Sequence, residues 1–367
     1  MRSKMNWLYV FACLTIAVGV ASATTVSSAV INDPGEPGSV LVFPLYKVGL
    51  AANTDSGTAP LSAFEVSVVC PNGAVCQPGG PDTSPAATSG DVDIHFHWVC
   101  DDFAPQCEET DFTLETTVNG TIRFDPNGNC LPKLDTSTNG FETCGGIIPP
   151  PPCDDGYLIG WVVDDFGNPI KFDGLLGDAV LRQDGQYSAV TAYNAIAIQA
   201  GKGLATYAST DLYHNGHLNF NGVAYKSLSN TIIGSVRFDG TDPDTGISSI
   251  TELALLTLDT KSNLPNNPVE VRFNVYNEIE QGASFNTAFW CTEEVYLSDI
   301  GVTADRMQGQ KGLLTGTGYK TPILGTGDKT GPVTLLGLVI THEDGFSREF
   351  AYPLLDNSIP LATAFAP

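Results

Sequence analysis

The sequence has few positively charged side chains. It carries 17 lysine and arginine residues against 41 aspartate and glutamate residues, for a formal net charge of −24. Nucleic acids and anionic lipid surfaces would repel such a chain, so we predict no nucleic-acid partner. The acidity has two remaining interpretations: solubility outside the cell, which we favour, or divalent cations bound by carboxylate-rich loops. A divalent cation is therefore the one cofactor that the composition suggests, and none is required.

The sequence also lacks the short motifs of common catalytic sites. It contains no Gly-x-Ser-x-Gly elbow, no His-Glu-x-x-His helix and no glycine fingerprint for dinucleotides. The tandem Gly316–Thr321 and Gly325–Thr330 has no Gly directly before Lys, so we interpret it as a glycine-rich loop or hairpin. Adjacent carboxylates such as Asp154 and Asp155 point to opposite faces of a strand and do not form a glycosidase pair by themselves. We assign no catalytic residue.

Long apolar runs are scarce, and the clearest one is N-terminal. Arg2 and Lys4 precede an apolar stretch from Trp7 to about Val20, and the small residues Ala21–Ala23 follow it. This is the layout of a secretory signal peptide, and the stretch is shorter than the roughly 20 residues of a transmembrane helix. We predict that residues 1–23 are removed, that the protein is exported to the periplasm or the cell exterior, and that it has no transmembrane anchor.

The nine cysteines fall to eight if Cys13 leaves with the signal peptide. An even number in an exported chain predicts disulfide bonds among Cys70, Cys76, Cys100, Cys107, Cys130, Cys144, Cys153 and Cys291. Eight cysteines allow 105 connectivities, and two local bonds are favoured because each pair brackets a short, turn-rich segment. These are Cys70 with Cys76 and Cys100 with Cys107. Zinc is disfavoured because no two cysteines have Cys-x2–4-Cys spacing.

Helical periodicity is scarce as well. Short runs of Val, Ile, Phe, Tyr and Thr are broken by Gly, Pro, Asn and Asp, which is typical of strands. In Val92–Cys100 the apolar residues alternate with polar ones, which would face solvent. The best helix candidates, around Leu204–Tyr213, would be single short helices. We therefore predict an all-β protein of β-sandwich type.

An internal duplication is indicated by two strand matches that share one offset along the chain. Val92–Phe96 matches Val269–Phe273, and Leu158–Val163 matches Leu335–Ile340. A third match, Gly38–Val40 with Gly234–Val236, has a longer offset. The interpretation is two related β-sandwich domains, because the length exceeds what one core usually covers. Their predicted extents are residues 24–203, with disulfide-rich loops, and 204–367.

Three segments carry a resemblance to known proteins. Gly38–Pro44, Leu175–Asp178 and the C-terminal Arg348–Leu354 resemble those of exported bacterial β-rich proteins without an assigned function. The resemblance implies a secreted bacterial protein, and it transfers no catalytic residue.

Four of the five histidines occur in two pairs. His95 and His97 lie two apart on a predicted strand and share a face, so they could offer two imidazoles to one metal ion; His214 and His217 could supply a further ligand. The alternative is that the first pair consists of half-exposed strand residues and the second of turn residues. The histidine pairs carry the only metal-site residues that we single out.

Oxygen-rich loops give a weaker indication of a cation. Asp239, Asp242 and Asp244 precede Gly246 in one loop, and Asp125 is followed by two asparagines in another. Such side chains can bind Ca²⁺, but neither loop has the closing Glu of an EF-hand, and β-turns use the same residues. We favour turns.

The sequence thus favours an exported, non-enzymatic structural or binding module of the cell surface, matrix or periplasm, with cell-surface or matrix components as partners. The alternative from another class is a secreted hydrolase that acts on polysaccharide, with aspartates in the loops as acid and base. The discriminating feature would be a cleft that holds two carboxylates at glycosidase separation.

Overall fold

The structure is a computed structural model, and it describes residues 36–53, 57–69, 91–101, 107–130, 144–164, 167–182, 189–201, 218–220, 222–258, 268–320, 331–345, 347–356 and 365–366. Within these ranges the regular elements are β-strands apart from one short helix, α1 (Ala304–Met307). The all-β prediction is confirmed.

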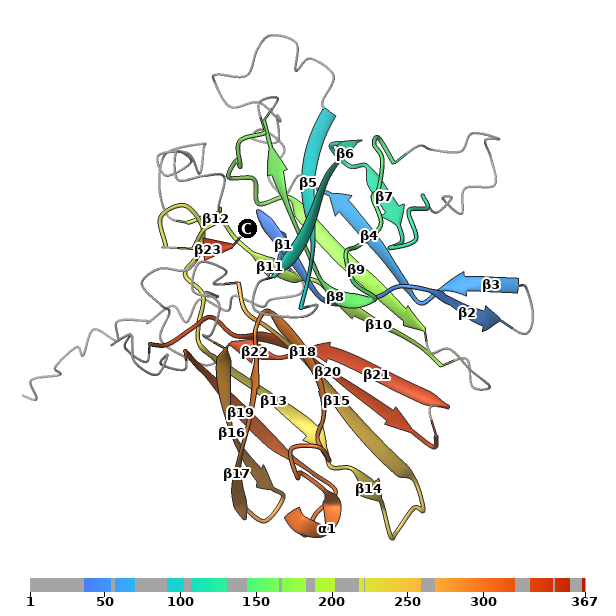
Figure 1. The fold of residues 1–367 in the computed structure, drawn as a ribbon, viewed down its shortest axis with the longest axis vertical. Helices are drawn as coiled ribbons and strands as arrows, with labels where there is room; N and C mark the ends of the chain where they lie inside the picture. The colour runs from blue at the N-terminus through green and yellow to red at the C-terminus, as the bar shows by residue number, and fades with distance from the viewer. Residues whose placement is uncertain are drawn as a thin grey trace, which may run out of the picture.

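Four antiparallel sheets form a ring that resembles a four-bladed propeller (Figure 1). The first half of the chain supplies two of them. Sheet I has the order β11 (Ile196–Ile198), β1 (Val40–Lys47), β8 (Asp155–Val163), β5 (Asp91–Cys100), β6 (Glu108–Thr117). Sheet II has the order β10 (Val190–Asn194), β9 (Leu175–Arg182), β4 (Ser62–Val68), β7 (Thr121–Phe124).

The second half of the chain supplies the other two sheets. Sheet III has the order β17 (Gly282–Phe289), β16 (Val269–Asn277), β19 (Lys311–Lys320), β13 (Thr231–Arg237), β22 (Leu355–Asp356). Sheet IV has the order β14 (Gly240–Thr241), β15 (Ser248–Leu256), β20 (Leu336–Glu343), β21 (Arg348–Pro353), and β18 (Thr292–Tyr296) also pairs with β15. Two small ladders join β2 (Leu50–Asn53) to β3 (Gly57–Pro60) and β12 (Leu218–Asn219) to β23 (Phe365–Ala366).

The two halves have the same strand topology. Sheet I reads β11-β1-β8-β5-β6 and sheet III reads β22-β13-β19-β16-β17, so each strand of one has a counterpart in the other in chain order. In sheets II and IV, β4 and β15 each pair with two strands, β7 and β9 in one half and β18 and β20 in the other. The edge strands β10 and β21 then follow β9 and β20.

One kind of side-chain contact occurs in both halves and shows which residues correspond. In sheet I, Phe96 on β5 pairs directly with Gly160 on β8; in sheet III, Phe273 on β16 pairs with Gly316 on β19. A Cβ atom at Gly160 would lie 2.5 Å from the Phe96 ring, and one at Gly316 would lie 2.9 Å from the Phe273 ring. Both glycines therefore make room for an aromatic ring, and the two halves agree in packing as well as in strand order.

The matches between segments of the sequence agree only in part with the strand correspondence between the two halves. The match of Val92–Phe96 with Val269–Phe273 agrees with it, since β5 and β16 are counterparts. The match of Leu158–Val163 with Leu335–Ile340 does not, because β8 corresponds to β19 and β20 corresponds to β9. The correct pair of strands is β9 and β20. The sequence Leu-Leu-Gly, which occurs at Leu175–Gly177 and at the start of β20, could have identified it.

The glycine-rich tandem was interpreted as a loop or a hairpin, and its described part is not a loop. Residues 316–320 lie in β19, the central strand of sheet III, and Tyr319 pairs antiparallel with Pro332, which agrees with the hairpin alternative. Glycine weakens an isolated strand, but here Gly316 lies under Phe273 and a Cβ at Gly318 would lie 3.1 Å from the Val333 carbonyl. Close packing thus explains glycines that look like a loop in the sequence.

Apolar clusters lie between the sheets. Sheets I and II face each other across one cluster, in which Phe43, Phe64, Phe96 and Trp98 are fully buried. Sheets III and IV face each other across a second cluster that contains Phe273. The first cluster is not confined to the first half of the chain, because Ala254, Leu338 and Ile340 of sheet IV belong to it.

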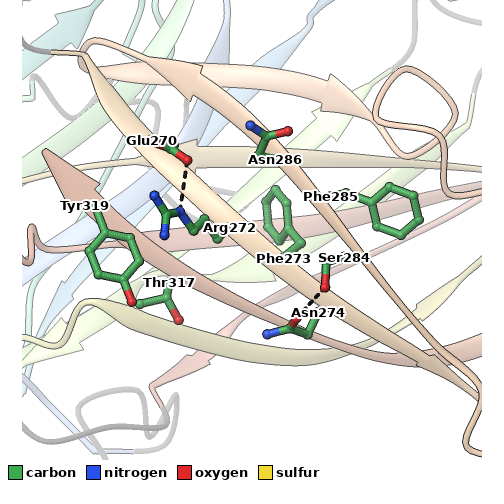
Figure 2. Close-up of a pocket in the computed structure, with 9 residues that line it drawn as sticks. All are labelled: Glu270, Arg272, Phe273, Asn274, Ser284, Phe285, Asn286, Thr317 and Tyr319. Carbon is green, nitrogen blue, oxygen red and sulfur yellow. Dashed lines mark hydrogen bonds and ion pairs between the residues drawn. The ribbon is translucent and has the colours of Figure 1, made fainter. Parts of the chain in front are cut away.

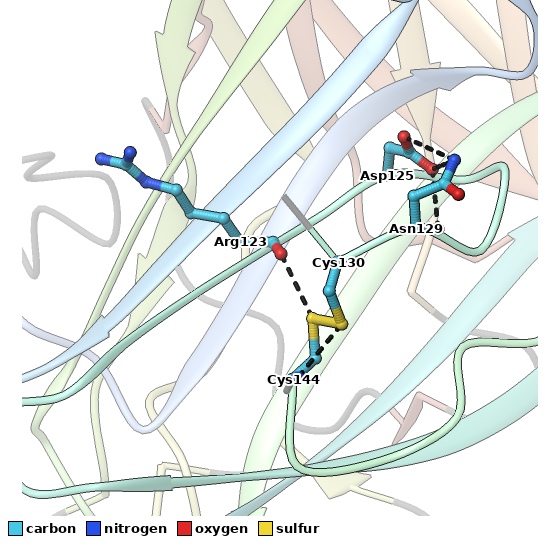
Figure 3. The surroundings of a disulfide bond; sticks show 5 residues. All are labelled: Arg123, Asp125, Asn129, Cys130 and Cys144. Carbon is cyan, nitrogen blue, oxygen red and sulfur yellow. Dashed lines mark hydrogen bonds between the residues drawn. A yellow bond between two sulfur atoms is a disulfide. The ribbon is translucent and has the colours of Figure 1, made fainter. Parts of the chain in front are cut away.

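Three disulfides lie in the described ranges: Cys100–Cys153, Cys107–Cys291 and Cys130–Cys144. The predicted local bond between Cys100 and Cys107 is therefore wrong. Local spacing misled the prediction because β5 and β8 bring Cys100 near Cys153, with Cα atoms 6.1 Å apart. Figure 3 shows Cys130–Cys144, which closes a loop beside Arg123. Only Cys107–Cys291 joins the two halves among these three.

Some predictions fall outside the described residues. These are the signal peptide at residues 1–23, the helix candidate near residues 204–213, the Cys70–Cys76 bond, and the His214 and His217 pair. Among the helices that the structure does describe, none has the length and apolar character to span a bilayer.

Candidate functional site

The outer face of sheet III carries an open groove of about 370 Å³ (Figure 2). Strands β16, β17 and β19 supply its lining: Glu270, Arg272, Phe273, Asn274, Ser284, Phe285, Asn286, Thr317 and Tyr319. Side chains alternate along β16: the odd-numbered residues from Val269 to Val275 are buried in the core and the even-numbered ones face outward. The groove is thus lined mainly by polar groups that are fixed on a rigid sheet.

Arg272 is held in position on both sides. Its Nε donates to Glu270 Oε1 at 2.9 Å, and its guanidinium carbon lies 5.1 Å from the centre of the Tyr319 ring (Figure 2). The side chain is nevertheless 62% exposed. The charges of Arg272 and Glu270 cancel, so the groove presents oriented hydrogen-bond donors without a net charge.

Amide and hydroxyl groups continue this polar surface along β16. Ser284 Oγ donates to Asn274 Oδ1 at 2.9 Å, which orients the amide nitrogen of Asn274. Beyond Asn274 on the same face, Tyr276 pairs directly with Leu313 of β19, and each is 44% exposed. A polar groove therefore adjoins an exposed aromatic and aliphatic platform.

The corresponding face of sheet I is covered. Its outward residues, including Val40, Ile159 and Trp161, pack against the segment 218–228 that connects the halves. His95 and His97 lie on this face at the positions of Arg272 and Asn274, as the alignment of Phe96 with Phe273 requires. The prediction that this side of the strand faces solvent is wrong for His97, which is 9% exposed, because the connecting segment buries the neighbouring surface.

The two histidines interact through their Nε2 atoms, which lie 2.9 Å apart. His95 Nδ1 is 2.9 Å from Thr113 Oγ1, and His97 Nδ1 is 3.4 Å from Glu109 Oε2. Both rings contact the Trp161 ring, with centroids 5.1 and 4.9 Å away. Burial and the neighbouring His97 lower the pKa of His95 to about 4, so it is neutral at physiological pH.

In the described ranges, no group of three or more His, Cys, Asp or Glu side chains is arranged so that it could hold a metal ion without rearrangement. The predicted meeting of the two histidine pairs stays a prediction, since His214 and His217 lie outside those ranges.

The oxygen-rich loops use their carboxylates to hold turns. Asp125 Oδ1 accepts from the backbone N–H group of Asn127 and from that of Asn129, and Figure 3 shows the contact with Asn129. Asp242 Oδ1 accepts from Asp244 N at 2.8 Å, and Asp239 is 8% exposed and accepts from Thr251 N at 2.7 Å. These contacts support the turn interpretation.

A second polar cluster joins the two halves, and no local pattern along the chain indicates it. Lys47, at the end of β1, reaches sheet IV, where its Nζ lies 3.2 Å from Glu252 Oε1 and 2.6 Å from Glu294 Oε2. Burial and a hydrogen bond to Glu252 raise the pKa of Glu294 well above its ordinary value. Burial opposes ionisation of Glu252, yet hydrogen bonds from Glu294 and His342 and the charge of Lys47 lower its pKa. Glu294 therefore holds a proton that it donates to ionised Glu252.

His342 completes this cluster from β20. Its Nε2 lies 3.3 Å from Glu252 Oε2 and its Nδ1 lies 3.4 Å from Glu349 Oε2, and the side chain is 1% exposed. Burial alone would lower the pKa of His342, but the hydrogen bonds to the two carboxylates raise it. Lys47 and His342 thus both contact Glu252, and His342 also contacts Glu349.

We expect the contacts of His342 with the two carboxylates to make the stability of the fold depend on pH above neutrality. Because the pKa of His342 is higher in the folded protein than its unfolded value near 6.5, its contribution is complete below that pH and is lost as pH rises through the folded pKa. The free energy of unfolding should therefore fall as pH rises above about 6.5 and through the folded pKa of His342, and His342→Gln should reduce this pH dependence. Urea titrations at a series of pH values measure it; equal slopes in both proteins would contradict the prediction.

A comparison of the chain with protein-family models finds no match, and a comparison with curated proteins finds none either.

Proposed function

We propose that this protein is a non-enzymatic binding module that holds a neutral polysaccharide on the outer face of sheet III. The observation that supports the proposal is the groove in which Arg272, braced by Glu270 and Tyr319, lies beside the oriented amide of Asn274. Sugars are recognised by fixed planar hydrogen-bonding groups next to an aromatic surface. Tyr276 supplies that surface two residues further along β16.

Charge favours a neutral ligand. The chain has a net charge of −24, which repels anionic polymers, and the one cation in the groove lining is paired with Glu270. A ligand with hydroxyl groups and no charge meets neither repulsion nor an unpaired cation.

The hydrolase alternative receives less support from either polar cluster. The groove lining contains one carboxylate, Glu270, whereas glycosidases use two that are about 5 to 9.5 Å apart. Glu252 and Glu294 are hydrogen-bonded to each other, which is closer than that separation. A direct hydrogen bond leaves no space for a sugar between them.

We also propose that the chain comprises two related β-sandwich domains, 24–203 and 204–367, exported after removal of residues 1–23. The repeated topology and the Phe-over-Gly contact in each half support the domains. The disulfides support an oxidising compartment, the periplasm or the cell exterior. Partners are then polysaccharides of the surface or matrix.

Arg272→Met should weaken polysaccharide binding about 10- to 100-fold, because two or more hydrogen bonds to a charged group are lost while the aliphatic stem is kept. Tyr276→Ala should weaken it as well. Affinity electrophoresis in gels that contain neutral glucans, mannans, xylans or galactans measures the effect on the whole protein.

The matched control is Arg348→Met, which removes an arginine that is 58% exposed on β21, outside the groove lining. Its binding should equal that of the wild type. Tighter binding to an acidic polysaccharide than to any neutral one, or full binding by Arg272→Met, would contradict the proposal.

A further inference from the structure

His95 and His97 are arranged as two ligands of one metal ion would be. Their Nε2 atoms converge to 2.9 Å on one face of β5, while each Nδ1 atom faces an oxygen on β6. Histidines that bind metal usually donate their second N–H to such an oxygen, which fixes the ring and its tautomer. Thr113 and Glu109 supply that support.

Without a metal ion the same atoms form a chain of hydrogen bonds. The Thr113 hydroxyl donates to His95 Nδ1, His95 Nε2–H donates to His97 Nε2, and His97 Nδ1–H donates to Glu109. An ion between the Nε2 atoms requires one change only: the His95 proton moves from Nε2 to Nδ1, where Thr113 Oγ1 accepts it.

Asp111 lies where a third ligand is needed. It pairs with His97 across β5 and β6, and its Oδ2 atom is 4.0 Å from His95 Nε2. The side chain is 70% exposed, so rotation about its bonds can bring the carboxylate to the ion. We propose that His95, His97 and Asp111 bind a transition-metal ion, of the Cu²⁺ or Ni²⁺ type.

The separation of the two nitrogens selects the class of ion. Two ligands at about 2.1 Å from one ion lie about 3.0 Å apart when they subtend 90° and about 3.4 Å apart at the tetrahedral angle. The hydrogen-bonded nitrogens are 2.9 Å apart, so an ion with 90° ligand angles needs less movement of the two rings than a tetrahedral ion does. Cu²⁺ also binds nitrogen ligands most tightly among the divalent first-row metals, so we expect it to exceed Zn²⁺ here.

The second half serves as an internal comparison. The counterparts of His95, His97 and Asp111 are Arg272, Asn274 and Ser284, a set that cannot bind a transition metal. The site is therefore particular to the first half, and it is independent of the proposed saccharide groove.

Titration of the whole, untagged protein with Cu²⁺ tests the proposal through Trp161, whose ring contacts both histidines. We expect quenching of tryptophan fluorescence at one equivalent, and an electron paramagnetic resonance spectrum with two coordinated nitrogens. Asp111→Asn should weaken binding about tenfold and His97→Gln at least 100-fold. Glu115→Gln, the same kind of charge change on β6, should leave it unaltered.

Three outcomes would overturn the proposal. The first is unchanged affinity in Asp111→Asn, which is informative even if His97→Gln fails to fold because Asp111 is exposed. The second is loss of binding on replacement of His214 and His217 with binding retained in His97→Gln. The third is tighter binding of Zn²⁺ than of Cu²⁺.

Discussion

Replacing Lys47 by methionine should lower the free energy of unfolding by about 3 to 5 kcal/mol, the range seen when one partner of a buried ion pair is removed. Lys47 is the one contribution of β1 to the cluster on sheet IV, and its ammonium lies between Glu252 and Glu294. Glu252 is 2% exposed and has lost nearly all of its water. Without Lys47 its negative charge is paired with His342 alone.

The pKa values indicate how the variant would respond. Glu294 and Glu252 together raise the pKa of Lys47 although burial opposes this, and the charge of Lys47 in turn lowers the pKa of Glu252. Removal of the ammonium should drive proton uptake by Glu252, which weakens the contact with His342 in turn. The loss should therefore be smaller at pH 5 than at pH 8.

The matched control is Arg348→Met, which removes a cation that is 58% exposed and 3.8 Å from Glu343. Exposed pairs contribute about 0 to 1 kcal/mol, so this variant should be nearly as stable as the wild type. Guanidinium titrations of both variants with disulfides intact measure the difference. Similar small losses in both would show that the cluster does not stabilise the contact between the halves.

The sequence predicted what depends on neighbours along the chain. The alternation in Val92–Cys100 identified a strand with Phe96 and Trp98 in the core, because side chains on a strand alternate between faces. Oxygen-rich loops were interpreted as turns, and Asp125 does cap one. In each case a few adjacent residues determine the structure.

The errors concern contacts between distant segments. Nothing near Cys107 identifies Cys291 as its partner, and nothing near Gly316 shows that the Phe273 ring lies over it. A glycine-rich stretch looks like a loop until the neighbouring strand is known. Lys47 and Glu252 likewise meet only because β1 of one half packs near β15 of the other.

The groove on sheet III was missed for a related reason. Arg272, Asn286 and Thr317 are far apart in the sequence and come together because β16 lies between β17 and β19. The even-numbered polar residues of β16 were the available signal, since they mark an uncovered sheet face.

An effect at least as large as that of Lys47 is expected from the bond between Cys107 and Cys291. Its partners are 184 residues apart, and it joins the segment between β5 and β6 to the segment between β17 and β18. Loop-closure entropy grows with the length of the closed loop, so removal by Cys107→Ser with Cys291→Ser should cost about 4 to 5 kcal/mol. Asp101, whose carboxylate accepts from Trp290 N at 3.0 Å, would keep a weaker contact between the same segments.

The double variant Cys130→Ser, Cys144→Ser is the matched control, because its bond closes a loop of 14 residues inside the first half. The same entropy argument gives about 3 kcal/mol for that loop. The two variants should also differ in the shape of their thermal unfolding transitions. Loss of Cys107–Cys291 frees the halves to unfold separately, so calorimetry should show a broadened or split transition, whereas loss of Cys130–Cys144 should leave the transition of the second half unchanged. A single sharp transition in the Cys107 and Cys291 variant, with a stability equal to that of the control, would mean that the packing of β1 against sheet IV joins the halves without the disulfide.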